Sequence, residues 1–142
     1  MQVKEYLSQA RYLDFGIRAK MKQVESLNRL ATEACSALLG TPHGQNRCIS
    51  KTENTVVKII DLQNEIRRDI DRLVDRKRKI AALICAIDSP VQQALLEKRY
   101  LCFQPWEQIA ADLGFSMHYL YKVHNVALEK CEKILKEDTK RH

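Results

Sequence analysis

The sequence contains few of the residues that make tight turns: its 142 residues include only 4 glycines and 3 prolines. A fold of many short strands needs frequent turns, so this scarcity argues against a β-rich architecture. No apolar run approaches the roughly 18 residues that cross a bilayer. The first six residues contain a charge pair and no apolar stretch, so we expect no signal peptide and a cytoplasmic protein.

Recognisable catalytic and metal-binding patterns are also missing. The five cysteines are widely spaced, with no CxxC or HxxxH pattern, so we expect free thiols rather than disulfides or a zinc site. No Ser-His-Asp set, nucleotide-cradling glycine loop or carboxylate pair stands out. We therefore expect a protein that is not an enzyme and that needs no metal and no cofactor.

The net charge of +6 is spread along the chain. Residues 1–39 and 40–52 each carry +2, whereas residues 53–88 and 89–142 each carry +1. Charge alone therefore marks no segment as a nucleic-acid binder. The densest basic run, Arg76-Lys77-Arg78-Lys79, is interpreted first as a solvated helix face, with contacts to DNA phosphates or to polymerase carboxylates as the alternative.

Two long amphipathic helices are predicted for the first 88 residues. The first runs from Val3 to Leu39 and should stop near Gly40. Its apolar residues recur at the coiled-coil period: Val3, Leu7, Ala10, Leu13, Ile17, Met21, Val24, Leu27, Ala31, Ala34 and Leu38. Residues 40–52 have no periodicity and are predicted to form a loop.

The second helix is predicted to start at Ser50 or Thr52, where Ser50-Lys51-Thr52-Glu53 fits a capping box, and to end near Asp88. Its apolar series is Val56, Ile59, Leu62, Ile66, Ile70, Leu73, Ile80, Ile84 and Ile87. Two such helices joined by a loop pack most simply as an antiparallel hairpin. The apolar seam is thin, so we expect self-association, most simply as a dimer.

A domain boundary is predicted at Asp88-Ser89-Pro90, because Pro90 ends one helix and suits the first position of the next. Ser89 and Gln92 form a second capping-box pattern. The sequence therefore divides into a hairpin domain, residues 1–88, and a small helical domain, residues 89–142. The second domain should contain helices at 90–102, 105–113 and 116–137, so the expected fold class is all-α.

The stretch from Trp106 to Val126 has the helix-turn-helix pattern, with an ordinary corner between two helices as the alternative. Gly114 is expected at positive φ, and Ser116 is expected to cap the next helix. Six positions should face inward: Ile109, Ala110, Leu113, Leu120, Val123 and Ala127.

The second helix of this pattern is the candidate DNA reader, because no acidic residue occurs between Leu113 and Leu128. Asparagine can pair with adenine, lysine can reach guanine or phosphate, and tyrosine and histidine can bond phosphate or contact a thymine methyl group. The ordinary interpretation of His118 and His124 is solvation at the protein surface. The candidate DNA-binding residues are Ser116, Met117, His118, Tyr119, Tyr121, Lys122 and Asn125.

Residues 100–131 resemble region 4 of bacterial sigma factors. The matching residues are Glu107, Ala110, Leu113, Gly114 and Ser116, followed by Ala127-Leu128-Glu129-Lys130. The resemblance implies a helix-turn-helix that binds double-stranded DNA, with RNA polymerase as a second candidate partner. The sequence shows no counterpart of region 2, the part of a sigma factor that melts the promoter, so we do not expect a stand-alone sigma factor.

The whole chain is similar to an uncharacterised family of phage and prophage proteins from Gram-positive bacteria. The similarity is carried by Gln23-Val24-Glu25-Ser26-Leu27, by Val57-Lys58-Ile59-Ile60-Asp61-Leu62, and by Arg99-Tyr100-Leu101 with Trp106-Glu107-Gln108-Ile109-Ala110. It implies a phage-encoded, sequence-specific DNA-binding transcriptional regulator. The alternatives are a DNA-packaging adaptor similar to a terminase small subunit and a helical module that binds another protein.

Overall fold

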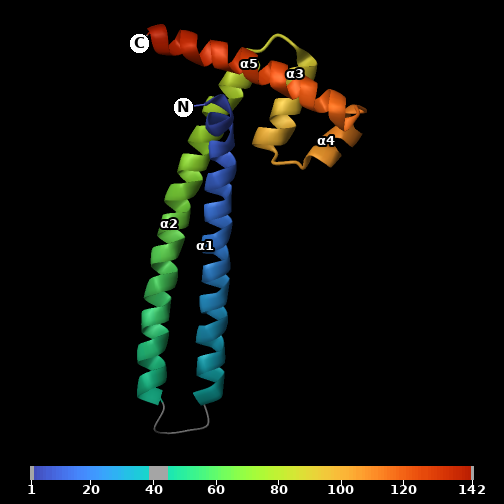
Figure 1. Cartoon of the computed structure of the whole chain (residues 1–142). Coiled ribbons are helices and arrows are strands. Elements are labelled where there is room, and N and C mark those ends of the chain that lie inside the picture. The colour runs from blue at the N-terminus through green and yellow to red at the C-terminus, as the bar shows by residue number, and fades with distance from the viewer. Residues whose placement is uncertain (1, 39–44, 142) are drawn as a thin grey trace. The chain divides into compact units, whose positions relative to one another are not determined.

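The structure is a computed structural model that describes residues 2–38 and 45–141, with side chains for residues 2–33 and 52–141. All secondary structure in these ranges is helical, which confirms the expected all-α class. The elements are α1 (Val3–Leu38), α2 (Gln45–Cys85), α3 (Pro90–Leu96), the π-helical turn η1 (Glu97–Leu101), α4 (Trp106–Leu113) and α5 (Met117–Arg141) (Figure 1).

The chain forms two compact units. The core unit comprises Met1–Leu13 together with Leu73–His142, and the two-helix unit comprises Asp14–Arg72. The boundary near residue 88 predicted from the sequence lies inside the core unit, where it marks the short turn between α2 and α3. The first turns of α1 and the last turns of α2 therefore group with the three C-terminal helices.

The start of α2 differs from the prediction. The helix begins at Gln45, so the part of the predicted 40–52 loop from Gln45 onward is helical, and Ser50 lies inside the helix instead of capping it. No glycine or proline stands between Gln45 and Thr52, and a helix propagates easily once nucleated. The predicted stop of the first helix at Gly40 lies outside the described residues.

In the two-helix unit, α1 and α2 lie side by side, but their seam is shifted from the predicted one (Figure 1). Ile17 and Ile59 are buried as expected, whereas Met21, Val56 and Ile70 are exposed by 56%, 44% and 42%. The placement of these three residues in the seam was wrong.

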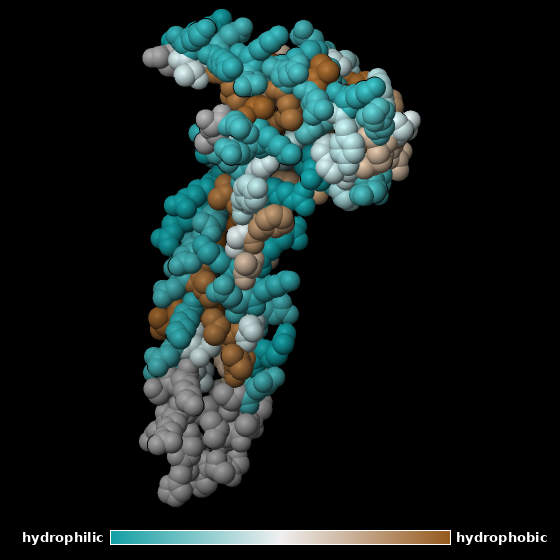
Figure 2. All heavy atoms as spheres, in the orientation of Figure 1, coloured by the Kyte–Doolittle hydropathy of each residue, from teal (hydrophilic) through white to brown (hydrophobic). Residues whose placement is uncertain are grey.

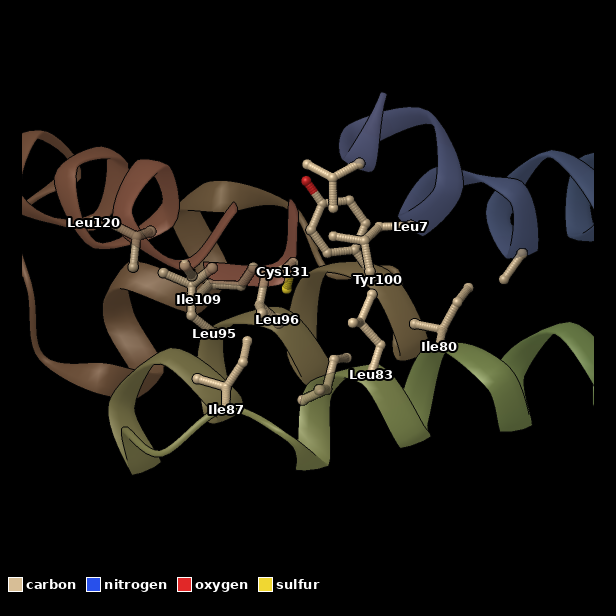
Figure 3. Packing of buried hydrophobic residues seen from close by; sticks show 14 residues of the cluster. Leu7, Ile80, Leu83, Ile87, Leu95, Leu96, Tyr100, Ile109, Leu120 and Cys131 are labelled. Atoms are coloured by element: carbon tan, nitrogen blue, oxygen red, sulfur yellow. The ribbon is translucent and has the colours of Figure 1, made fainter. Parts of the chain in front are cut away.

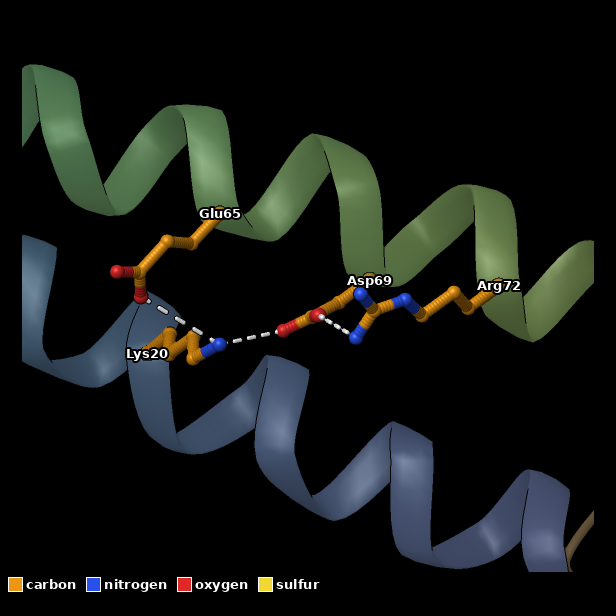
Figure 4. Close-up of polar contacts among 4 residues, drawn as sticks. All are labelled: Lys20, Glu65, Asp69 and Arg72. Atoms are coloured by element: carbon orange, nitrogen blue, oxygen red, sulfur yellow. Dashed lines mark hydrogen bonds and ion pairs between the residues drawn. The ribbon is translucent and has the colours of Figure 1, made fainter.

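Lys20 and Asp69 stand in the seam in place of Met21 and Ile70, their neighbours in sequence. Lys20 Nζ lies 2.6 Å from an oxygen of Asp69 and 3.5 Å from one of Glu65 (Figure 4). The hydrogen bond to Asp69 is the main reason that the pKa of Lys20 is raised. An ion pair across the seam therefore occupies a position that the apolar pattern assigned to hydrophobic side chains.

The core unit holds one continuous hydrophobic cluster (Figure 3). Its fully buried large side chains are Leu7, Ile80, Ile84, Leu95, Leu96, Ile109, Leu120 and Cys131. They come from every helix of the unit, so none of these helices buries its apolar face alone. Each fully buried leucine or isoleucine contributes about 1.5–3 kcal/mol relative to an exposed one.

The junction before the C-terminal helices matches the prediction in part. Ser89 Oγ accepts a hydrogen bond from the backbone N–H of Gln92 at 3.4 Å, and Pro90 is the first residue of α3. Gln92 Oε1 is buried and has no hydrogen-bond partner, so the return bond of a capping box is not made. Ser89 therefore caps α3 by itself.

The helix predicted for residues 90–102 changes type midway. After Leu96 the chain forms the π-helical turn η1, which the Cys102 N–H closes on the carbonyl of Glu97 at 3.0 Å. A π-helical turn is wider than an α-helical turn and shifts the register of the residues around it. Leu96 and Tyr100 are both buried at this shifted register.

Candidate functional site

The turn between α4 and α5 is fixed by one glycine. Gly114 has φ +72°, in the left-handed region, and its N–H donates to the Ala110 carbonyl at 2.9 Å. The Phe115 N–H donates to the same carbonyl at 3.1 Å. These bonds end α4, and the φ of +72° confirms the positive φ predicted for Gly114. An added Cβ there would meet no atom within 4 Å, so the backbone dihedral, not space, favours glycine.

Ser116 caps α5 as expected. Its Oγ accepts from the Tyr119 N–H at 3.2 Å, and its carbonyl accepts from the Leu120 N–H at 2.9 Å. A serine in this place satisfies a backbone donor that the first turn of a helix otherwise leaves free. Gly114 and Ser116 together set where α4 stops and where α5 begins.

Apolar side chains hold the two helices in place. Ile109, Leu120 and Ala127 are fully buried, which confirms their inward orientation. The other three predicted inward positions, Ala110, Leu113 and Val123, are partly buried and pack against the same cluster. The face of α5 opposite these residues is therefore turned to solvent.

The exposed face of α5 contains most of the candidate residues. Met117 is partly buried, and the other six are exposed: Ser116, His118, Tyr119, Tyr121, Lys122 and Asn125. The Tyr119 ring meets Phe115 edge-on at 4.9 Å between ring centres, and Tyr121 meets Trp106 at 5.2 Å. Both tyrosines are thus held by aromatic neighbours while 49% and 44% of their surfaces face solvent.

His124 is not a surface residue, so its predicted solvation was wrong. It is 5% exposed, and its Nε2 lies 2.7 Å from the hydroxyl of Tyr100. Its ring stacks on that of Tyr100 and meets Trp106 edge-on at 4.8 Å. The signal was present in the sequence, because His124 follows Leu120 by four residues and precedes Ala127 by three, which is the spacing of one helix face.

Burial keeps the Tyr100–His124 pair uncharged near neutral pH. It lowers the pKa of His124 to about 4, and the positive charges of Lys4 and Arg99 act in the same direction. Burial also raises the pKa of Tyr100 to about 12. A neutral, hydrogen-bonded pair of this kind fixes how α5 lies on η1, because each partner would leave the other unsatisfied if it were removed.

Arg99 lies beside this pair and supports the start of α4. Its guanidinium group stands 4.8 Å from the centre of the Trp106 ring, and its Nη1 donates to the Gln104 carbonyl at 3.1 Å. Burial lowers the pKa of Arg99 from its ordinary value, and repulsion from Arg11 adds to the shift. Arg99 therefore serves the packing of Trp106, the residue that in turn contacts Tyr121.

Three of the four cations in the basic run of α2 are engaged within the core unit. Arg76 lies over the ring of Tyr6 at 6.0 Å, and Lys77 lies over the ring of Phe103 at 4.8 Å. Lys79 pairs with Asp75 at 3.3 Å. These contacts favour the interpretation of the run as part of a folded surface over a role in binding phosphates.

Within the described residues, neither a metal-binding cluster nor a membrane-spanning helix is found. Within residues 2–33 and 52–141, no group of three or more His, Cys, Asp or Glu side chains is arranged to hold a metal ion. Cys85 and Cys102 are exposed free thiols, and burial raises the pKa of Cys131 to about 11. Among the described helices, none is long and apolar enough to cross a membrane.

Comparison with known protein families identifies the chain's relatives at the family level. Residues 43–132 match the family described as a protein of unknown function, DUF1492. Since the match spans more than half of the 142 residues, the chain belongs to this family. No curated protein and no solved structure matches the chain.

Proposed function

We propose that this protein is a sequence-specific DNA-binding transcriptional regulator encoded by a phage or prophage, and that α4 and α5 form a helix-turn-helix similar to sigma factor region 4. In this proposal α1 and α2 form an antiparallel hairpin that precedes the DNA-binding helices. The protein acts in the cytoplasm of the bacterial host, with double-stranded DNA as its partner and RNA polymerase as a second one.

The exposed face of α5 is the observation that carries this proposal. His118, Tyr119, Tyr121, Lys122 and Asn125 are exposed there, the capping residue Ser116 is exposed just before the helix, and no acidic residue occurs between Leu113 and Leu128. A DNA-reading helix meets a polyanion, so the absence of carboxylates matters as much as the presence of donors. The turn at Gly114 and the cap at Ser116 define the start of this helix, and a helix in the major groove presents residues near its N-terminus to the bases.

Four side chains of this face have expected roles in binding DNA. Asn125 has the amide that pairs with adenine, and Lys122 has the charge that reaches guanine or phosphate. Tyr119 and Tyr121 offer hydroxyl groups for phosphates, on rings that their aromatic contacts already hold in place. Rings fixed before binding lose less conformational entropy when the complex forms.

The test begins with selection of bound sequences from random duplex DNA by the full-length protein, followed by titration of the selected duplex. We expect Lys122→Ala to weaken binding roughly fivefold at low salt on all sequences and to reduce the salt slope by about one. His118→Ala and Asn125→Ala should instead change the preferred sequence, with losses of about 1–3 kcal/mol for each base contact.

The matched control is Lys133→Ala, which removes the same charge from the exposed surface of the same helix, 11 residues further along. It should change affinity less than Lys122→Ala does. Wild-type protein that binds no duplex at low salt would refute the proposal and favour a protein-binding module. Specific binding by a large ring of subunits would favour a packaging adaptor instead.

A further inference from the structure

Within the two-helix unit, α2 carries a second apolar stripe that α1 does not cover. We call it the outer stripe, and it comprises Val56, Ile60, Gln63, Arg67 and Ile70. Its steps of four, three, four and three residues are those of one coiled-coil face. The seam with α1 instead uses Ile59, Leu62, Ile66 and Asp69, which are buried or partly buried.

The outer stripe is open to solvent. Val56, Ile60 and Ile70 are exposed by 44%, 49% and 42%, and Gln63 and Arg67 are exposed as well. Val74 continues the same spacing on the same helix and is 51% exposed. Figure 2 shows hydrophobic side chains reaching an otherwise hydrophilic surface along the described part of α1 and α2. Ordered apolar spacing on an exposed helix face indicates an interface.

With Val74 included, the apolar residues of the outer stripe are placed symmetrically about residue 65, and its two polar residues occupy equivalent positions. Reversing the direction of the helix about residue 65 exchanges Ile60 with Ile70, Val56 with Val74 and Gln63 with Arg67. In a two-fold symmetric interface, residue i contacts residue j of the partner and j contacts i. Two antiparallel copies of α2 therefore place isoleucine against isoleucine, valine against valine and an amide against a guanidinium group.

The charges of α2 favour the same arrangement. Residues 53–65 carry three acidic and one basic side chain, whereas residues 66–79 carry seven basic and three acidic side chains. An antiparallel pair sets the acidic half of each helix beside the basic half of the other. A parallel pair in register would set basic half against basic half.

We propose that two copies of this chain associate through the outer stripes of their α2 helices, antiparallel and centred on residue 65. At the centre, the Gln63 side-chain oxygen accepts from the Arg67 guanidinium group of the other copy. A polar layer of this kind specifies register at a cost in stability. The interface is small, so we expect a dissociation constant on the order of micromolar. The association does not require DNA, so a test of the dimer is independent of a test of the proposed DNA-binding function.

The experiment is sedimentation equilibrium of the full chain, without DNA, from low to high micromolar concentration. Wild type should shift from monomer to dimer. Ile60→Glu alone and Ile70→Lys alone should each weaken the dimer about a hundredfold, because each buries two unpaired charges per dimer. An equimolar mixture of the two variants should dimerise again, because the carboxylate introduced at position 60 of one chain then opposes the ammonium group introduced at position 70 of the other.

The chain that carries both substitutions distinguishes the two orientations. An antiparallel dimer regains two Glu–Lys pairs and should form, whereas a parallel one would oppose Glu to Glu and Lys to Lys. Val91→Glu is the matched control, because Val91 is 39% exposed and lies outside the outer stripe, and it should leave the dimer intact. Circular dichroism checks that all variants keep their helicity.

Three results would overturn the inference. They are a wild type that stays monomeric at the highest concentration, an Ile60→Glu variant that dimerises as well as wild type, and a mixture that fails to recover.

Discussion

At the scale of single residues, the two described glycines have opposite effects on stability. Gly114 adopts φ +72°, where residues other than glycine, asparagine and aspartate are strained, whereas Gly16 lies inside α1 with open space around it. We expect Gly114→Ala to lower the free energy of unfolding by roughly 1–2 kcal/mol. The same change at Gly16 should raise it by about 0.5–1 kcal/mol. Thermal and denaturant unfolding of both variants measures this, and equal signs would contradict it.

His124 gives a second prediction at this scale, concerning pH. Its pKa is about 4 in the folded protein, below the ordinary 6.5, so the folded state disfavours the charged ring. The contribution of the uncharged ring to the free energy of unfolding is complete above pH 6.5 and is lost as the pH falls toward 4. We expect this loss to be on the order of 2 kcal/mol.

The measurement is the free energy of unfolding from pH 7 to pH 4 for wild type and for Tyr100→Phe/His124→Phe, which removes both hydrogen-bonding partners. The difference in the free energy of unfolding between the two proteins should change with pH over this range. His118→Gln, a change at an exposed histidine, should follow the wild-type profile. A difference independent of pH would show that His124 is not the titrating group.

At the scale of helices, the polar layer in the α1–α2 seam predicts coupling between two positions. Lys20 lies 2.6 Å from Asp69, a carboxylate whose side chain is only 15% exposed. Lys20→Leu alone leaves Asp69 without this cation in a half-buried seam and should destabilise the pair of helices. Lys20→Leu with Asp69→Leu places two apolar side chains there and should restore or exceed wild-type stability.

Melting temperatures of the four proteins in this double-mutant cycle provide the test. We expect each single variant to melt a few degrees below wild type and the double variant to recover. Arg18→Leu breaks the exposed pair of Arg18 with Asp14 and serves as the control, with little expected effect. If the decreases in melting temperature of the two single variants add up in the double variant, Lys20 and Asp69 act separately.

At the scale of the whole molecule, the two units differ in how many hydrophobic side chains they bury. Among the described residues, the two-helix unit buries only Ile17 and Ile59, whereas every other buried hydrophobic residue belongs to the core unit. Local stability follows buried apolar contacts, so the two units should open with different free energies.

Amide hydrogen exchange at low protein concentration measures this difference. We expect faster exchange in the middle of α2, near Ile60, than in α5 near Leu120. Raising the concentration should slow exchange near Ile60 more than near Leu120, because association covers the outer stripe. Uniform protection across both units would contradict the prediction and indicate a single cooperative unit.

The sequence by itself determined the local features of this protein. The all-α class follows from helical periodicity with few glycines and prolines, and Ser89, Pro90, Gly114 and Ser116 act where the sequence placed them. These residues work through their own dihedral angles and their nearest backbone groups, so no distant contact is needed to predict them. The inward positions of α4 and α5 were also readable, because three- and four-residue steps define one face of a helix.

Only the tertiary structure decided which of several apolar faces is covered. α2 has hydrophobic residues on two faces, and the choice of Ile59 over Val56 for the seam depends on what α1 presents, including Lys20. His124 is buried because Tyr100 and Trp106, more than fifteen residues earlier in the sequence, supply a hydrogen bond and aromatic contacts. Periodicity in the sequence shows that a helix has an apolar face. Whether that face is buried depends on the residues that pack against it, and those residues come from elsewhere in the chain.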